Sequence, residues 1–156
     1  MSANITAQDL DLIFARWNQY DIPIAAKNKV MEHSLKVVDK IFDLITFMGT
    51  FDPGTSYTLG EETSKVVSPS LIACYYIGYE LASGRMSRTD GSDYLSAATQ
   101  PIGNFVLKIV SQLIVRDTSH QEDVRAIALE IAKATGEVSS DICILGIENF
   151  RSIGHQ

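Results

Sequence analysis

Cysteine is scarce in this chain, which has two cysteines among its 156 residues. Small proteins held together by disulfides need more cysteines, and structural zinc sites need closely spaced pairs of them. Cys74 and Cys143 each lie inside an apolar segment, far apart in the sequence. We therefore expect two buried, reduced thiols that pack as small hydrophobic side chains, and a fold that needs no disulfide.

Long hydrophobic runs are also missing. No stretch of about 18 apolar residues occurs, because Glu80, Lys108 and Gln112 interrupt the most apolar segments. The first residues, MSANITAQDLDLIF, lack the basic start and the apolar core of a secretory signal. The sequence therefore predicts a cytoplasmic protein that does not insert into a membrane.

Positive charge is the third deficit. The chain has 13 lysines and arginines against 19 aspartates and glutamates, which gives a net charge of −6. An acidic surface repels phosphate backbones, so a role in nucleic-acid binding is disfavoured. The densest basic segment, residues 27–40, is interrupted by Glu32 and Asp39, a pattern typical of a solvated helix face.

Sequence motifs of enzyme chemistry are absent as well. The chain has no phosphate-binding glycine loop, no dinucleotide fingerprint, no nucleophile elbow, and no C-x-x-C, H-E-x-x-H or EF-hand pattern. His33 is a conceivable general base, but the sequence assigns it no serine or cysteine nucleophile. We therefore predict no metal site, no cofactor and no catalytic residues, and we favour a function that is not enzymatic.

The sequence does contain apolar residues spaced three and four positions apart, which is typical of helices that pack on a core. We expect an all-α fold with one domain over residues 1–156, built as a bundle of about six helices. The expected helices cover residues 6–21, 24–48, 68–84, 92–116, 119–135 and 141–150, and Gly49, Gly84 and Gly136 are the expected stops. Pro101 either kinks the fourth helix or starts a new one.

Residues 50–67 carry weaker signals. Tyr57–Leu59 and Lys65–Val67 can pair as a short β-hairpin near residues 56–67, and an ordered surface loop is the alternative. Ser68 and Pro69 then form a typical helix start, with the proline in the first turn.

The segment Leu71–Ala82 is apolar almost all the way round, which predicts a helix at the centre of the fold. Cys74, Gly78 and Ala82 recur every four residues on this helix. These small side chains predict a shallow groove that the backbone of another helix can approach closely.

The candidate site surrounds this central helix. It has six residues, Tyr75, Tyr76, Tyr79, Glu80, Arg85 and Arg88. Burying an unpaired carboxylate costs several kcal/mol, so we expect Glu80 to lie at the rim, to be paired, or to have a raised pKa. The tyrosines either grip a partner or pack in the core with their hydroxyl groups bonded.

Two functions are consistent with these features. The first is a non-enzymatic adaptor-type interaction protein, accessory, regulatory or antidote-like, whose partner is another protein or a second copy in a homodimer. This function is suggested by a surplus of apolar residues that a six-helix monomer does not bury. The candidates for this surplus are Phe51, Met86, Ile147, Phe150 and Ile153. The second is a small-ligand-binding protein or enzyme with a tyrosine-lined pocket around Glu80.

Overall fold

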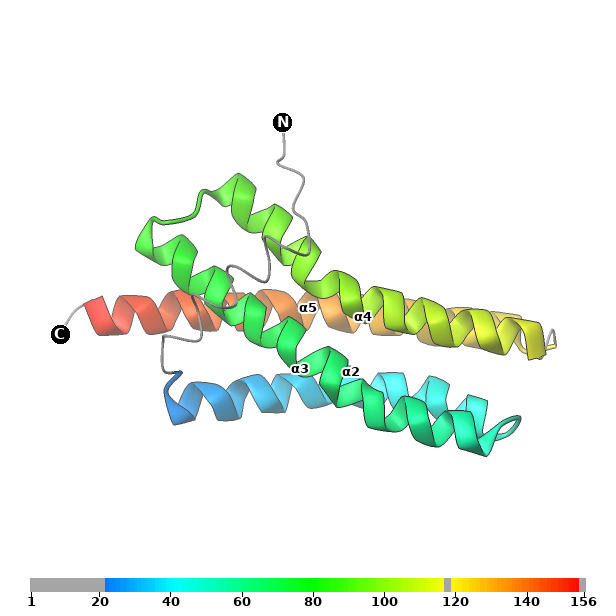
Figure 1. The fold of residues 1–156 in the computed structure, drawn as a ribbon. Helices are drawn as coiled ribbons and strands as arrows, with labels where there is room; N and C mark the ends of the chain where they lie inside the picture. Colours follow the sequence, from blue (N-terminus) through cyan, green and yellow to red (C-terminus); the bar gives the residue numbers. More distant parts are fainter. Residues whose placement is uncertain (1–21, 117–118, 155–156) are drawn as a thin grey trace.

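The computed structural model describes residues 22–116 and 119–154. These residues form four helices and no strand: α2 (Ile24–Gly49), α3 (Pro53–Ser83), α4 (Arg88–Arg116) and α5 (Gln121–Gly154). The all-α prediction is confirmed for this part of the chain, and the helix expected over residues 6–21 lies outside it. Figure 1 shows α3 running obliquely across both α2 and α5, and α4 lying beside part of α5.

The predicted β-hairpin is wrong, because residues 56–67 belong to the first half of α3. Asp52 caps this helix by accepting a hydrogen bond from the Thr55 backbone N–H, and Pro53 follows in the first turn. Leu59, Thr63 and Val67 are buried at four-residue spacing. This burial follows the helical period of 3.6 residues and not the alternation of a strand, so the segment packs on the core as a helix.

Pro69 lies inside α3 instead of starting it, and Pro101 lies inside α4. Each proline removes one backbone hydrogen bond to the carbonyl group four residues earlier. Both prolines are on the exposed side of their helix, and Lys65, whose carbonyl loses its donor in α3, is exposed as well. Water can therefore solvate that carbonyl group, and the helix continues past the proline.

The two helices predicted over residues 119–150 are one helix in the structure, so the prediction of about six helices is corrected to four for the described residues. Gly136 does not end a helix. The buried side of α5 continues through it with Ile131, Ala134, Thr135, Val138 and Ile142. Packing of this continuous stripe outweighs the ~1 kcal/mol that glycine costs in a helix interior.

Only one of the three predicted glycine stops has the left-handed backbone expected of it. Gly84 follows α3 with φ 80°, the single positive φ among the described residues. Gly49 is the last residue of α2, and Thr50 caps that helix in the right-handed region instead.

The centre of the fold is the second half of α3, as predicted. Helix α3 contacts α2, α4 and α5, and Leu71, Ala73, Cys74 and Ile77 on it are fully buried. Burial raises the pKa of the Cys74 thiol to about 12, so this buried cysteine is a poor nucleophile. Both cysteines are free and buried, in agreement with the expectation.

The close approach predicted for the small residues of α3 is confirmed at Gly78. A Cβ atom added to Gly78 would overlap the carbonyl oxygen of Cys143, and one added to Gly146 would overlap that of Tyr75. The backbones of α3 and α5 therefore touch where these two glycines meet. No helix in the described part of the chain has the length and apolar content to cross a membrane.

Candidate functional site

The structure divides the six predicted site residues between the core and the surface. Tyr75, Tyr76 and Glu80 are buried, and Tyr79 is half-buried. Both arginines, Arg85 and Arg88, are exposed around the turn that joins α3 to α4. Glu80 has no exposed surface, so the predicted position at the rim of the protein is excluded.

The tyrosines join α3 to the last turns of α5. The Tyr75 hydroxyl accepts a hydrogen bond from Asn149 Nδ2 at 2.7 Å, and burial raises the pKa of Tyr75. The ring of Tyr79 packs edge-on against Phe150, with the ring centroids 5.0 Å apart. These contacts fit the core alternative, in which tyrosines bury their rings and bond their hydroxyl groups. The binding role of the six residues stays a prediction.

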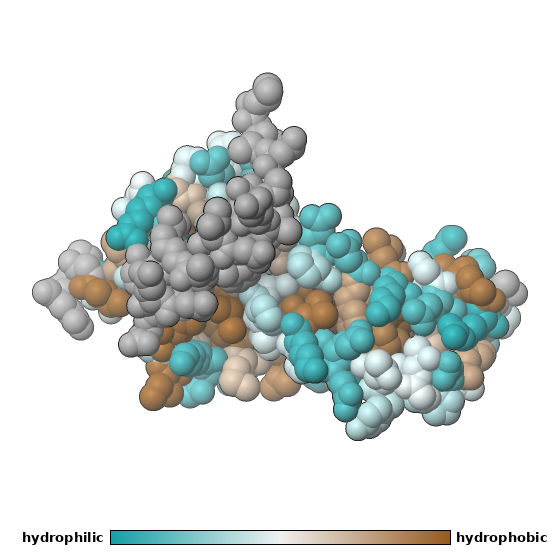
Figure 2. Space-filling view, in the orientation of Figure 1, coloured by the Kyte–Doolittle hydropathy of each residue, from teal (hydrophilic) through white to brown (hydrophobic). Residues whose placement is uncertain are grey.

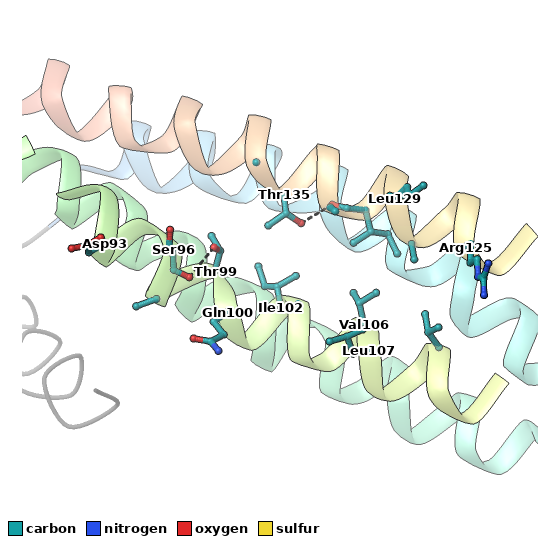
Figure 3. Close-up of a pocket in the computed structure, with 17 residues that line it drawn as sticks. Asp93, Ser96, Thr99, Gln100, Ile102, Val106, Leu107, Arg125, Leu129 and Thr135 are labelled. Atoms are coloured by element: carbon teal, nitrogen blue, oxygen red, sulfur yellow. Dashed lines mark hydrogen bonds between the residues drawn. The ribbon is translucent and has the colours of Figure 1, made fainter. Parts of the chain in front are cut away.

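A large groove lies elsewhere, between α4 and α5, with a volume of about 960 Å³ (Figure 3). None of the six predicted residues lines it. From α4 it is lined by Asp93, Ser96, Ala97, Thr99, Gln100, Ile102, Gly103, Val106, Leu107 and Val110. From α5 it is lined by Arg125, Ala128, Leu129, Ile131, Ala132, Thr135 and Gly136.

Small residues keep the groove open. The buried side chains of Ile102, Val106 and Ile131 line its inner side. Gly103 and Gly136 also line it, and they contribute no side chain that would fill it. A Cβ atom added to either glycine would meet no atom within 4 Å, so both glycines face open space. The groove therefore follows from the sequence, because larger side chains at these positions would fill the space between α4 and α5.

Two large apolar side chains line this groove and face solvent. Leu107 of α4 is 62% exposed and Leu129 of α5 is 71% exposed. Each exposed apolar Å² costs roughly 25 cal/mol relative to burial, and scattered leucines are common on surfaces. Two leucines that line one apolar groove from neighbouring helices, however, form a patch of the kind that marks a binding surface.

The groove has one charged residue near each end. Figure 3 shows Asp93 at one end and Arg125 at the other, and among residues 22–116 and 119–154 no other charged side chain lines the groove. Asp93 Oδ2 is buried and has no hydrogen-bond partner in the described part of the chain. Asp93 as a whole is partly exposed and lines the groove, so its negative charge makes this end suited to a basic partner residue.

No known family, curated protein or solved structure matches this chain. Its function is therefore inferred from the geometry alone.

A second, more polar cavity of about 460 Å³ lies near the start of α3 and the end of α4. Its charged lining residues are ion-paired: Lys108 pairs with Glu62, and Asp52 pairs with Arg116 outside the lining, each with 3.5 Å between nitrogen and oxygen. Their charges are already balanced, so this cavity offers less to a ligand than the apolar groove.

A second apolar surface lies on α2, away from the groove. Ile24, Met31, Leu35 and Phe42 are between 40% and 78% exposed. In Figure 2 hydrophobic residues gather over the first turns of this helix on the face shown. Among the predicted surplus residues, Phe51 and Ile153 are exposed, whereas Met86 and Ile147 pack partly against the core.

Sequence reasoning missed the groove, although one signal pointed to it. The core-facing stripe of the α4 segment is Ile102, Phe105, Val106 and Ile109, and Leu107 falls outside it. Leu129 likewise falls outside the core-facing stripe of α5. A large apolar residue outside such a stripe indicates exposure, but only the fold shows that the two leucines line the same groove.

Proposed function

We propose that this protein is a non-enzymatic interaction protein of the adaptor type, accessory or regulatory, which binds an amphipathic helix of a partner protein between α4 and α5. The observation that carries the proposal is the open apolar groove flanked by Leu107 and Leu129. Helix-in-groove binding uses such a surface, because the apolar stripe of a partner helix replaces water on it.

The dimensions of the groove fit one helix. The lining residues on α4 extend from Asp93 to Val110, which corresponds to about 26 Å at the rise of an α-helix. A partner helix of about 17 residues fills that length. Helices pack with their axes roughly 8–10 Å apart where the side chains between them are small. Gly103, Ala132 and Gly136 provide such a contact.

The charges at the two ends give the partner an orientation. Asp93 attracts a lysine or arginine at one end of the bound helix, and Arg125 attracts an aspartate or glutamate at the other. A helix with these charges reversed meets a like charge at each end. We therefore expect the protein to distinguish the two orientations of otherwise equivalent helices.

A display library of 18-residue peptides tests this proposal on the full chain. The peptides carry apolar residues at helical spacing, with lysine at one end and glutamate at the other, and the reversed peptides serve as a control. We expect enriched peptides with micromolar dissociation constants, at least tenfold weaker binding to Leu129→Glu, and unchanged binding to Leu35→Glu on α2. Leu129 is exposed, so its substitution leaves the fold intact.

Two results would contradict the proposal. One is that no peptide is enriched. The other is that the enriched peptides bind Leu129→Glu as tightly as they bind the wild-type protein, which would place them on another surface.

The alternative function, a small-ligand protein or enzyme with a tyrosine-lined pocket around Glu80, has less support. Tyr75, Tyr76 and Glu80 are buried, and neither they nor Tyr79 line the two cavities described above.

A further inference from the structure

We propose that α2 carries a self-association interface, through which two copies of the chain pair with their α2 helices antiparallel. The interface consists of Ile24, Met31, Leu35 and Phe42, named here the α2 stripe. The proposal does not rest on the groove function, because the α2 stripe lies on another helix and shares no residue with the groove.

The α2 stripe is one continuous face of the helix. At about 100° per residue, its four members fall within a sector of about 40°. The residues that bury α2 in its own core, among them Val30, Val37, Ile41 and Leu44, lie on a different side. The α2 stripe is therefore an apolar face in addition to the one that the fold uses.

The spacing of the α2 stripe identifies a second copy as its occupant. Ile24 and Phe42 lie nine residues on either side of position 33, and Met31 and Leu35 lie two residues on either side of it. A twofold axis at the height of position 33 therefore sets Ile24 of one copy against Phe42 of the other, and Met31 against Leu35. Contacts that are reciprocal in this way are the defining property of a twofold interface.

The charges along α2 favour the antiparallel arrangement. On the two sides of position 33, the exposed charges are Lys27, Lys29 and Glu32 in the first half and Lys36, Asp39 and Asp43 in the second, which makes the first half net basic and the second net acidic. Lys40, also in the second half, is paired with Glu130 of α5 at 3.6 Å. An antiparallel pair sets the basic half of each copy beside the acidic half of the other, whereas a parallel pair sets like charges together.

The size of the contact predicts a reversible dimer. The α2 stripe is about 27 Å long. A strip about 10 Å wide, the diameter of a helix, covers less than the ~800 Å² per partner of a standard interface. The ring of Phe42 lies against Gly60 of α3, and Tyr57, three residues earlier on α3, is also exposed, so the surface widens at this end. We expect a dissociation constant of about 10–100 µM, at the weak end for specific interfaces.

Sedimentation equilibrium of the full chain from 10 to 500 µM tests whether the dimer exists and where it forms. We expect the wild-type protein to dimerise and the double variant Met31→Glu/Leu35→Glu to remain a folded monomer, as judged by circular dichroism. Leu129→Glu in the groove is the matched control and keeps the wild-type dimerisation. A monomer at 500 µM, or a dimer that is lost in Leu129→Glu and kept in the α2 variant, would overturn the proposal.

Disulfide trapping tests the register. Ile24→Cys and Phe42→Cys chains, one of them tagged, are mixed and oxidised; the native Cys74 and Cys143 are buried. We expect a mixed disulfide between the two variants and at least tenfold less cross-linking in either variant alone, since like positions lie about 27 Å apart in the antiparallel pair. Efficient cross-linking of each variant to itself would show parallel pairing and overturn the antiparallel model.

Discussion

Asp52 stands directly before α3, and both oxygens of its carboxylate accept hydrogen bonds from Thr55. Oδ1 accepts from the backbone N–H at 3.1 Å, and Oδ2 accepts from the side-chain hydroxyl at 2.7 Å. These bonds, the side-chain one first, hold the pKa of Asp52 below its usual value, with a smaller contribution from the Arg116 guanidinium. The cap satisfies one of the N–H groups that every helix leaves free at its start.

Replacing Asp52 should therefore have an effect that depends on pH. The pKa of Asp52 is lowered in the folded state, so its contribution to stability is complete above the unfolded pKa near 4 and is lost as the pH falls through the folded pKa. We expect Asp52→Ala to have a lower Tm than the wild-type protein at pH 7, and we expect the difference to shrink below about pH 4. Thermal unfolding followed by circular dichroism from pH 2 to 8 measures it.

Asp52→Asn is the matched control for this experiment. Asparagine caps a helix about as well as aspartate but carries no titrating group. The difference in Tm between Asp52→Asn and Asp52→Ala should therefore stay constant with pH. A constant difference between the wild-type protein and Asp52→Ala would show that the charge of Asp52 contributes nothing.

At the scale of elements, the crossing of α3 and α5 brings two backbones into direct contact. Gly78 and Gly146 are both buried there, each beneath a carbonyl group of the other helix. Side chains cannot be accommodated at this point, because the atom that a Cβ would meet belongs to a backbone and cannot rotate away.

We therefore expect Gly78→Ala to destabilise the protein by about 2–3 kcal/mol, at the upper end for overpacking of a core. In a chain of this size that corresponds to a fall in Tm of roughly 5–10 °C. Urea unfolding measures the change. Gly103→Ala is the control: it is also a helical glycine, but its added Cβ meets open space, so stability should be unchanged or higher by up to ~1 kcal/mol. Equal effects of the two substitutions would contradict the close crossing.

The helices predicted best are those in which the spacing of apolar residues agrees with the residues that typically start and end a helix. The expected helix 24–48 differs from α2 by one residue, and Leu71–Ala82 is the central segment. The errors lie where a proline or glycine suggested a helix boundary but the helical spacing of apolar residues continued. Pro69 and Gly136 are typical helix boundaries, yet the core-facing stripes of α3 and α5 continue through both, and burial of those stripes decided the outcome.

The candidate site was less predictable than the fold. Glu80 and the tyrosines were singled out by their chemistry, and the structure places most of them in the core. The groove depends on which faces of α4 and α5 meet, and on Gly103 and Gly136 pointing into the same open space. Contacts between different helices set that geometry, and the spacing of apolar residues within one helix does not reveal it.

At the scale of the whole molecule, the two apolar surfaces lie on different helices and have different shapes. The groove is concave and has one charge at each end, while the α2 stripe is the convex face of one helix. The two proposed interfaces share no residue, so both can be occupied on one copy at the same time.

This separation predicts that the two binding events are independent. A peptide bound in the groove stabilises the folded chain by RT ln(1 + [L]/Kd), about 2.7 kcal/mol at a hundredfold excess over Kd. The rise in Tm should be equal in the wild-type dimer and in the monomeric Met31→Glu/Leu35→Glu variant, and at most about half as large in Leu129→Glu, where binding is at least tenfold weaker. Differential scanning calorimetry at one fixed protein concentration measures all three. A smaller rise in the α2 variant would show that the two surfaces are coupled. The contacts of α2 with α4 and α5, including the Lys40–Glu130 ion pair, would then transmit that coupling.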